Sequence, residues 1–400
     1  MPRDGAPRPR SPLALDLLNF FVADVQTGFG PFVAVYLTTH KWTQIQIGFV
    51  LTLGTIVALI SQIPAGALVD LVRNKRVAAG TALIFVIIAA LLLALRPTPL
   101  PVMVAQTLHA FASCVLTPAI AAISLHLVGH MALGERLGRN ARYASLGNGL
   151  AAAVMGATGA WLSSRAVFVL TAALCVPAIL SLLAIGRGEH AREQTTTRTF
   201  DWQGLRRLFT NRSLLTFAGA VALFHLSNAA MLPLVGATVT MRAGTLANLI
   251  IAACIVIPQI VVALCSPAVG RAAAVRGRRA VLILGWCALP VRGFLLAVLP
   301  GAWLPIAAQA ISGISGAVFG VMLPLLAADI TRGTSHFNLC MGVLGLAVSL
   351  GAAISTTVGG WIADTAGVQI AFASLALVGV AGALFVWLAM PETAQVPAAG

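Results

Sequence analysis

The sequence predicts an all-α integral membrane protein with twelve transmembrane helices in two pseudo-symmetric six-helix bundles. Three observations predict this fold class. Hydrophobic residues make up 59% of the 400 residues and charged residues only 9%, far from the balance of a soluble domain. Long apolar stretches follow one another along the whole chain, without the ten-residue alternation of a membrane barrel. The two halves of the chain also resemble each other.

The apolar stretches define the predicted helices in order. Each has the roughly 20 residues that a helix needs to cross the hydrocarbon of a bilayer. The expected spans are 13–37, 46–70, 77–96, 101–128, 143–163, 166–186, 213–239, 246–270, 280–299, 302–329, 337–362 and 368–389. The third, sixth and twelfth are almost uniformly apolar, which favours lipid-facing positions.

Positive charge sets the orientation of the chain. Of 25 Lys and Arg residues, 20 lie before the first span or in every second gap after it, and loops rich in these residues stay in the cytoplasm. We therefore expect both termini and the polar gap 187–212 inside, and the loop around Lys41 outside. The predominance of Arg over Lys fits a GC-rich bacterial genome, so a bacterial inner (plasma) membrane is the expected location.

Several function classes find no support in the sequence. The net charge of +14 is spread over the inner loops, where it faces lipid headgroups, so nucleic acid is not an expected partner. The six cysteines lie in or beside spans with no CxxC spacing, which excludes a zinc site. No Walker loop, HExxH or Ser–His–Asp spacing appears, so we expect no enzyme, metal or cofactor.

The sequence contains an internal repeat, in which matching segments lie 200 to 204 residues apart. The repeat predicts an N-terminal bundle at 1–186, a cytoplasmic linker at 187–212 and a C-terminal bundle at 213–400. Four matches in chain order support it: Phe20 to Pro31 with Ala222 to Pro233, Gln106 with Gln309, Gly159-Ala160-Trp161 with Gly359-Gly360-Trp361, and the loops described next. Parallel six-span repeats with a site at mid-membrane are the architecture of alternating-access carriers.

The loop between the second and third spans carries a motif. Residues 66–76 read GALVDLVRNKR, with Gly66, Asp70 and Lys75 at the positions of the pattern G-x-x-x-D-R-x-G-R-R. This resembles the signature of the major facilitator superfamily, although Leu71, Arg73 and Asn74 depart from it. The corresponding loop at 270–279 keeps Gly270 and Gly277-Arg278-Arg279 but has Ala274 in place of the acid.

The resemblance covers the whole chain and points to a bacterial branch whose cargo is mostly unassigned. It implies transport of a small molecule, with the fourth and tenth spans lining a central cavity. It also implies that Asp70 contacts the start of the eleventh span when the carrier is open outward. We therefore assign a gating role to four residues: Gly66, Asp70, Lys75 and Arg76.

One titratable residue lies deep in the first span of each half. Asp24 sits near the middle of its span, where a charged side chain costs about 3 kcal/mol on insertion scales, and such acids are functional by default. Histidine titrates nearest neutral pH, and His225 lies one position from the repeat mate of Asp24. Both are predicted to couple transport to protons. The alternatives are an acid that pairs structurally and a histidine bonded to one neighbour.

Polar residues form stripes on the expected cavity-lining helices. Gln106, His109 and Ser113 share one face of the fourth span, and Gln309 and Ser312 lie on the matching face of the tenth. Asn228 shares the face of His225. We predict that these six line the substrate cavity, the alternative being that they only join helices. Arg292, inside the ninth span, is expected to snorkel to the outer headgroups.

The sequence therefore favours a secondary active transporter that exports a small, partly apolar organic molecule in exchange for protons, working as a monomer. The glycines of the fifth span partly match an antiporter pattern, although Ala157 replaces its proline; helix packing alone also explains them. Proton-coupled uptake is the first alternative. A non-transporting membrane receptor or scaffold is the alternative of another class, and it has no need of Asp24.

Overall fold

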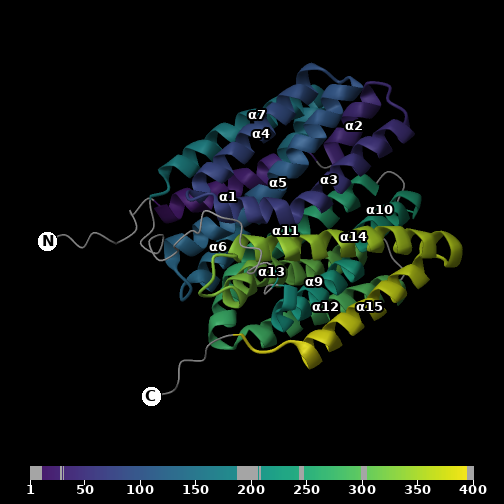
Figure 1. Cartoon of the computed structure of the whole chain (residues 1–400). Coiled ribbons are helices and arrows are strands. Elements are labelled where there is room, and N and C mark those ends of the chain that lie inside the picture. Colours follow the sequence, from purple (N-terminus) through teal and green to yellow (C-terminus); the bar gives the residue numbers. More distant parts are fainter. Residues whose placement is uncertain are drawn as a thin grey trace, which may run out of the picture. The chain divides into compact units, whose positions relative to one another are not determined.

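The structure is a computed structural model of the chain that describes residues 11–27, 29, 31–186, 206, 209–242, 247–298 and 304–393. Every regular element in these ranges is a helix (Figure 1). Ten of the described helices are long and apolar enough to cross a membrane, and the expected all-α membrane fold is confirmed. The chain divides into two compact units, residues 1–201 with 333–342 and residues 202–332 with 343–400.

The first unit holds the helices α1 to α7 and the start of α14. Their bounds are α1 Ser11–Thr27, α2 Pro31–Thr39, α3 Gln44–Leu71, α4 Lys75–Leu95, α5 Pro99–Val128, α6 Leu133–Trp161 and α7 Ser164–Ala184. Helix α5 packs against α3 and α4, while α7 packs against α1 and α4. The buried apolar side chains of α1 to α5 and α7 form one core cluster, and α6 contributes to a smaller one with α7.

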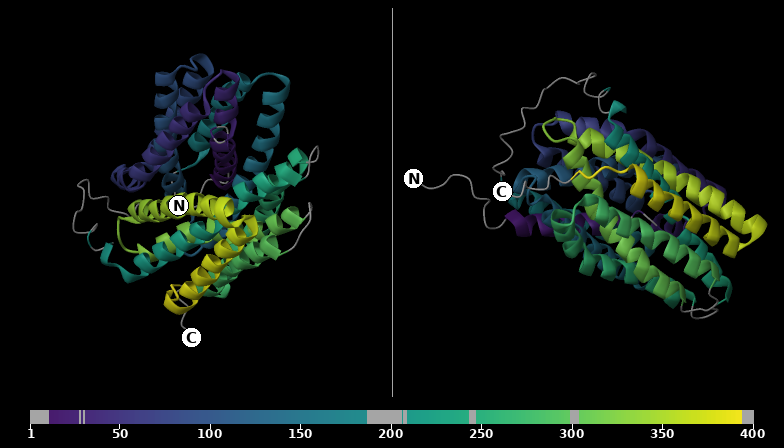
Figure 2. Two further views of the ribbon diagram at one scale, coloured as in Figure 1. Left: turned by 90° about the vertical axis from the view of Figure 1, so that its right-hand side faces the viewer. Right: turned by 90° about the horizontal axis from the view of Figure 1, so that it is seen from below.

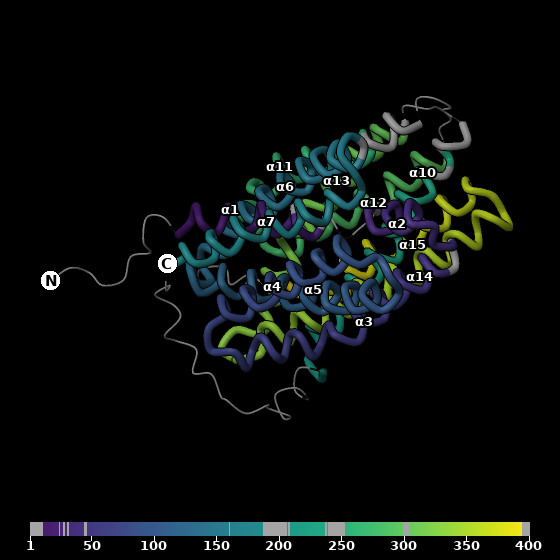
Figure 3. Tube along the Cα trace, turned by 90° about the horizontal axis from the view of Figure 1, so that it is seen from above, coloured from purple at the N-terminus to yellow at the C-terminus, as the bar shows by residue number. Residues whose placement is uncertain are grey.

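The second unit repeats this packing (Figures 2 and 3). Its helices are α9 Arg212–Asn228, α10 Met231–Arg242, α11 Ala247–Val275, α12 Arg278–Val298, α13 Leu304–Ile330, α14 Phe337–Ala366 and α15 Val368–Ala389, the unit boundary falling within α14. Helix α13 packs against α11 and α12 as α5 does against α3 and α4, and α15 packs against α9 and α12 as α7 does against α1 and α4. The internal repeat is thus a structural one.

Glycines let the first and fifth helices of each repeat approach closely. In the first unit a Cβ on Gly147 of α6 would collide with the carbonyl oxygen of Phe20 in α1. In the second unit a Cβ on Gly351 of α14 would collide with that of Ala222 in α9. These two contacts occupy matching places in the repeat, so the packing explanation for the glycines holds at these positions.

The first helix of each repeat differs from the single span that the sequence predicted. The expected span 13–37 is two helices, α1 and α2. In the expected span 213–239 a two-residue turn at Ala229 and Ala230 separates α9 from α10, although the stretch Arg212–Gly236 is together long and apolar enough to cross a membrane. A proline lacks the N–H for a helical hydrogen bond and clashes with the carbonyl four residues earlier. Pro31 and Pro233 lie four residues after Thr27 and Ala229, where the two helices are interrupted.

The expected fifth span, 143–163, begins ten residues too late. Helix α6 starts at Leu133, and its polar first turns are helical because buried partners satisfy them, as described below. The expected linker 187–212 lies outside the described residues, except for residues 206 and 209–212.

Candidate transport site and gating contacts

The carboxylate of Asp70, one residue from the end of α3, binds the first turn of α14 within the first unit. One carboxylate oxygen accepts hydrogen bonds from the backbone N–H and the side-chain amide of Asn338, at 3.1 and 2.7 Å. The other accepts from the backbone N–H of Leu339 at 2.8 Å. The first N–H groups of a helix have no partner inside the helix. Asp70 therefore caps α14 from a different helix, and its charge also suits the positive end of the helix dipole.

Two glycines allow this approach of α3 and α14. A Cβ on Gly66 would collide with the carbonyl oxygen of Asn338, and one on Gly342 would collide with that of Gln62. The contact is reciprocal, because each helix presents a glycine to the backbone of the other. A larger residue at Gly66 would push α14 away from Asp70.

Lys75 and Arg76 bind the C-terminal ends of helices, whereas Asp70 binds an N-terminal end. The ammonium group of Lys75, which is buried, donates to the carbonyl oxygens of Val69, Asp70 and Val72 at 2.7, 3.1 and 3.0 Å, and so caps the C-terminal end of α3. The guanidinium of Arg76 donates to the carbonyl of Ile185, just after α7. Both cations thus satisfy carbonyls at negative helix ends.

The second unit keeps these two caps. Arg278 donates to the carbonyl of Ala273 near the end of α11 at 2.5 Å, and Arg279 donates to the carbonyl of Trp387 in α15. They cap helix ends as Lys75 and Arg76 do, although the second loop is one residue shorter, so that by number the offset is 203 for these cations. Ala274 stands where Asp70 stands in the first unit.

Acids from elsewhere in the second unit surround its loop. Asp329 of α13 pairs with Arg278 at 3.0 Å. The carboxylate of Glu392 accepts from the backbone N–H groups of Arg278 and Arg279, at 2.8 and 3.1 Å, and so caps the start of α12.

Two of the predicted cavity residues of the first unit lie together on α5. The imidazole of His109 stacks on the ring of Phe29 with centroids 3.8 Å apart, and its Nε2 lies 3.4 Å from Ser113 Oγ. Gln106 is buried in the same helix, close to Gly54 of α3. Asp24 belongs to α1, but its side chain lies outside the described part of the chain.

His225, in α9 of the second unit, lies among aromatic rings. Its ring meets the edge of Phe319 from α13 at a centroid distance of 4.7 Å. Its Nε2 atom is buried and has no hydrogen-bond partner among the described residues, as is also true of the amide nitrogen of Gln309. Ser312 is partly exposed on the same helix as Gln309. Each unit therefore pairs one imidazole with one phenyl ring between its first span and its fourth.

The expectation that Arg292 snorkels to the membrane surface is wrong. Its side chain is 1% exposed, inside the second unit, and Nη1 donates to Asn228 Oδ1 at 2.6 Å. The face of α12 that carries it also carries Leu289, Gly293 and Leu296, which pack inward. Asn228, predicted to line the cavity, thus has a buried cation as its partner.

Comparison with known proteins identifies the chain. The family model described as "Major Facilitator Superfamily" matches residues 15–257 and 230–399. The chain belongs to the major facilitator superfamily. An MFS-type transporter of Mycobacterium tuberculosis, described as uncharacterized in strains CDC 1551 / Oshkosh and ATCC 25618 / H37Rv, is 37% identical over 396 residues, covering 96% of this chain and 94% of the relative.

Solved structures of the superfamily share the fold. The human organic anion transporter MFSD10 matches with a TM-score of 0.76 at 14% identity, over 95% of this chain and 100% of that one. The Escherichia coli fucose:proton symporter matches with a TM-score of 0.77 at 16% identity, over 96% and 99%. At these identities the likeness concerns the fold.

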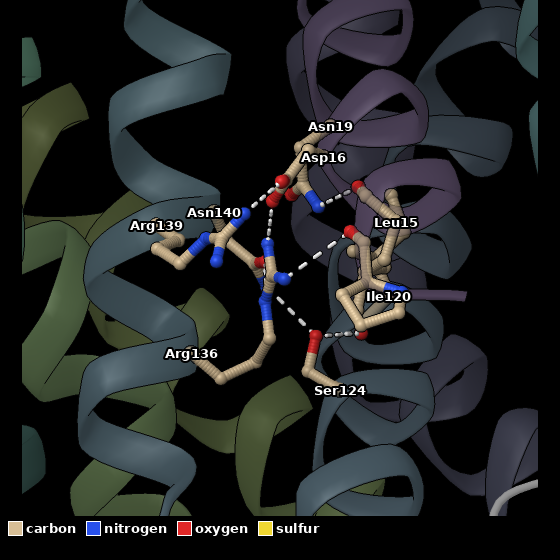
Figure 4. Close-up of polar contacts among 9 residues, drawn as sticks. Leu15, Asp16, Asn19, Ile120, Ser124, Arg136, Arg139 and Asn140 are labelled. Carbon is tan, nitrogen blue, oxygen red and sulfur yellow. Dashed lines mark hydrogen bonds and ion pairs between the residues drawn. The ribbon is translucent and has the colours of Figure 1, made fainter. Parts of the chain in front are cut away.

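The first unit of this superfamily transporter also contains a buried ion cluster that sequence reasoning missed (Figure 4). Asp16 of α1 is fully buried and pairs with Arg136 and Arg139 of α6, the second at 2.5 Å. Arg136 Nε donates to Asn140 at 2.8 Å, and Asn140 donates to Ser124 of α5 at 2.7 Å. The cluster ties three helices together, and it explains why the polar start of α6 is helical.

Proposed function

We propose that this protein is a secondary active transporter that works by alternating access and exchanges protons for a small, partly apolar organic molecule, which it exports. Its family makes it a transporter. The proposal concerns the mechanism, the coupling ion, the direction and the class of cargo.

The contact of Asp70 with α14 carries the proposal of alternating access. Asp70 belongs to the first six-span repeat in the sequence, and α14 belongs to the second. The contact consists of hydrogen bonds, which can break and form again. An acid at a helix N-terminus contributes about 0.3–1 kcal/mol, and up to about 2 kcal/mol when partly buried. A contribution of that size biases two nearly balanced states without locking either. Gly66, Lys75 and Arg76 hold Asp70 in the position from which it gates.

Proton coupling rests on Asp24 and His225. An acid inside a membrane helix is functional by default, and a histidine is the side chain whose charge changes nearest neutral pH. His225 supports this role because its Nε2 has no partner among the described residues and so is free to take one. We propose that Asp24 and His225 take up protons from outside when cargo is released there, and give them up to the cytoplasm.

The class of cargo is proposed from the residues that the sequence predicts to line the cavity. Gln106, His109, Ser113, Gln309 and Ser312 offer neutral hydrogen-bonding groups. Phe29 and Phe319 offer ring faces and edges beside the two histidines. A site of this composition suits a molecule with an apolar body and few polar groups better than a sugar acid or a phosphate ester.

We further propose two bundles, 1–186 and 213–400, joined by a cytoplasmic linker at 187–212, in a monomer of a bacterial inner membrane with both termini inside. The positive charge of the gaps supports this orientation. Reporter fusions at Lys41 and Gln194 are expected to lie on opposite sides of the membrane. Fusions that report the same side contradict it.

The test of exchange uses everted membrane vesicles from cells that express the protein. Respiration acidifies the vesicle lumen, and a pH-sensitive dye reports the gradient. Addition of an exported compound from a panel of amphipathic toxins is expected to collapse part of the gradient. Asp24→Asn is expected to abolish this response, because an amide cannot cycle a proton. Asp364→Asn, at an exposed acid of α14, is the matched control and is expected to keep it.

Two outcomes contradict parts of the proposal. A full response in Asp24→Asn shows that this acid is structural. A deletion strain that fails to grow on one nutrient, with unchanged resistance to every toxin, shows uptake in place of export.

A further inference from the structure

The interruption of the seventh span, between α9 and α10, makes hydrogen bonds with three other helices of the second unit. The guanidinium of Arg292 in α12 binds Asn228, the last residue of α9. The backbone N–H of Ala230 donates to Ser355 Oγ of α14 at 3.0 Å. The hydroxyl of Ser227 donates to the carbonyl of Leu375 in α15 at 2.8 Å. We call these three contacts the clamp.

Two contacts of the clamp are buried, and the contact between Arg292 and Asn228 is partly buried. Ser227 and Ser355 have no exposed surface, and Arg292 is 1% exposed. A buried backbone N–H without a partner costs about 1–3 kcal/mol, and the interruption of a helix creates such groups. Ser355 therefore stabilises the interrupted backbone directly, by accepting the N–H of Ala230.

The hydrogen-bond partner of Arg292 is unusual for a buried cation. A buried cation normally faces a carboxylate, as Arg136 and Arg278 do here. Arg292 makes no ion pair with any described residue, and its Nε has no hydrogen-bond partner among them. Among the described residues its guanidinium donates to a neutral amide, that of Asn228. Such a contact lacks the attraction of opposite charges, so an acid at position 228 would hold Arg292 more tightly.

At the repeat positions of Arg292 and Ser355, the first unit carries alanines. The repeat places Ala89 opposite Arg292 and Ala151 opposite Ser355, and both alanines are buried. The first span instead carries glycines on either side of Phe29. The seventh span thus has polar contacts with α12 and α14 that the two alanines of the first unit cannot make.

We propose that Arg292 is a positioning residue that, with Ser355, sets how often the seventh span opens at Ala229 and Ala230. Release of Asn228 by Arg292 frees α10 to move relative to α9. The inference rests on the proposed alternating access, in which the first helix of each repeat moves. It assigns the restrained movement to the seventh span.

Hydrogen exchange of the purified protein in lipid nanodiscs tests the clamp without any cargo or proton gradient. The readout is the exchange rate of the peptide covering residues 226–235. Ser355→Ala is expected to raise that rate about fivefold, the factor that corresponds to one hydrogen bond of about 1 kcal/mol. Arg292→Lys, which keeps the charge but loses the guanidinium geometry, is expected to raise it as well. Ser315→Ala removes another buried hydroxyl of the unit and is expected to leave it unchanged.

A gain of restraint separates a clamp from a general packing role. Asn228→Asp gives Arg292 an opposite charge, so exchange of the same peptide is expected to fall below that of the unmodified protein. Thermal unfolding of each variant identifies any that fails to fold. The proposal is overturned if Ser355→Ala and Arg292→Lys leave the peptide unchanged, or if Asn228→Asp speeds its exchange. Because no transport is measured, these results stand whether or not the proposed exchange of cargo and protons is found.

Discussion

The loops at 66–76 and 270–279 occupy the same place in the two repeats, yet they share only half of their chemistry. In both, one cation caps the end of the helix before the loop and a second caps a helix end nearby: Lys75 and Arg76 in the first, Arg278 and Arg279 in the second. Only the first loop has an acid, Asp70, that binds the first turn of another helix.

This difference separates the role of the cations in the motif from the role of the acid. The cations satisfy carbonyls that every helix end leaves unpaired, so both repeats need them to fold. The acid makes a contact that the fold of a single repeat does not require. In the second unit Asp329 pairs with Arg278, and Glu392 caps the start of α12. The duplicated part of the motif is therefore structural, and the unduplicated part is the candidate switch.

The units also differ in the partners of their buried charges. In the first unit Asp16 pairs with two arginines, whereas in the second unit Arg292 binds a neutral amide. The largest expected effect concerns the first of these. Arg136→Ala leaves the fully buried carboxylate of Asp16 with only Arg139, whose side chain is 46% exposed. Breaking one side of a buried ion pair costs about 3–5 kcal/mol. We expect a large fall in the thermal unfolding midpoint of Arg136→Ala, measured in detergent.

Two further variants sharpen that test. Arg142→Ala removes an exposed cation of the same helix and is expected to change the midpoint little. Asp16→Asn combined with Arg136→Gln removes both charges, and is expected to be less damaging than Arg136→Ala alone. If the double variant is the worse of the two, desolvated charge is not what the cluster balances.

The sequence located the two loops but not the buried clusters, for a physical reason. Asp70, Lys75 and Arg76 act within or next to a short motif, and the repeat supplied a second copy against which to read it. The partners Asp16 and Arg136 are 120 residues apart, and nothing local joins them. The polar start of α6 looked like a loop because hydropathy cannot show that a distant acid will satisfy its arginines.

The same limit explains Arg292 and the interrupted helices. Hydropathy located the ninth span, but not which of its faces packs inward, so the arginine was assigned to the membrane surface. Pro31 and Pro233 were visible, whereas the apolar pattern continues across both interruptions and predicted unbroken helices. Asp24 stays a prediction, because its side chain lies outside the described part.

The close approach of the first and fifth helices is where the two units should behave alike. Gly147→Ala and Gly351→Ala each place a methyl group against a backbone carbonyl, which cannot move as a flexible side chain can. Overpacking of this kind costs about 1–3 kcal/mol. We expect similar falls in the unfolding midpoint for both variants. A Cβ on Gly156 meets nothing within 4 Å, so Gly156→Ala is the control that should be neutral or slightly stabilising. A fall for only one of Gly147 and Gly351 contradicts the equivalence of the two units at this contact.

The smallest expected effect in free energy is the one closest to function. Asp70→Asn removes the negative charge at the start of α14 and turns an amide N–H₂ toward backbone donors, while leaving Lys75 and Arg76 in place to hold the loop. The loss should be about 1 kcal/mol, because a charge at a helix end contributes about 0.3–1 kcal/mol and somewhat more when partly buried. Stability should therefore hardly change, but hydrogen exchange of residues 337–342 should rise about fivefold, and the state open to the cytoplasm should gain population.

A cysteine at Ser312 reports that population, in a background where the more accessible native thiols, Cys265 and Cys287, are replaced. Asp70→Asn should speed its labelling from the cytoplasmic side. Ala274→Asp, the reciprocal change, should alter neither readout, since Asp329 and Glu392 already serve Arg278 and the start of α12. Unchanged exchange and labelling in Asp70→Asn would make the acid as structural as the cations beside it, and an effect of Ala274→Asp as large as that of Asp70→Asn would remove the distinction between the two loops.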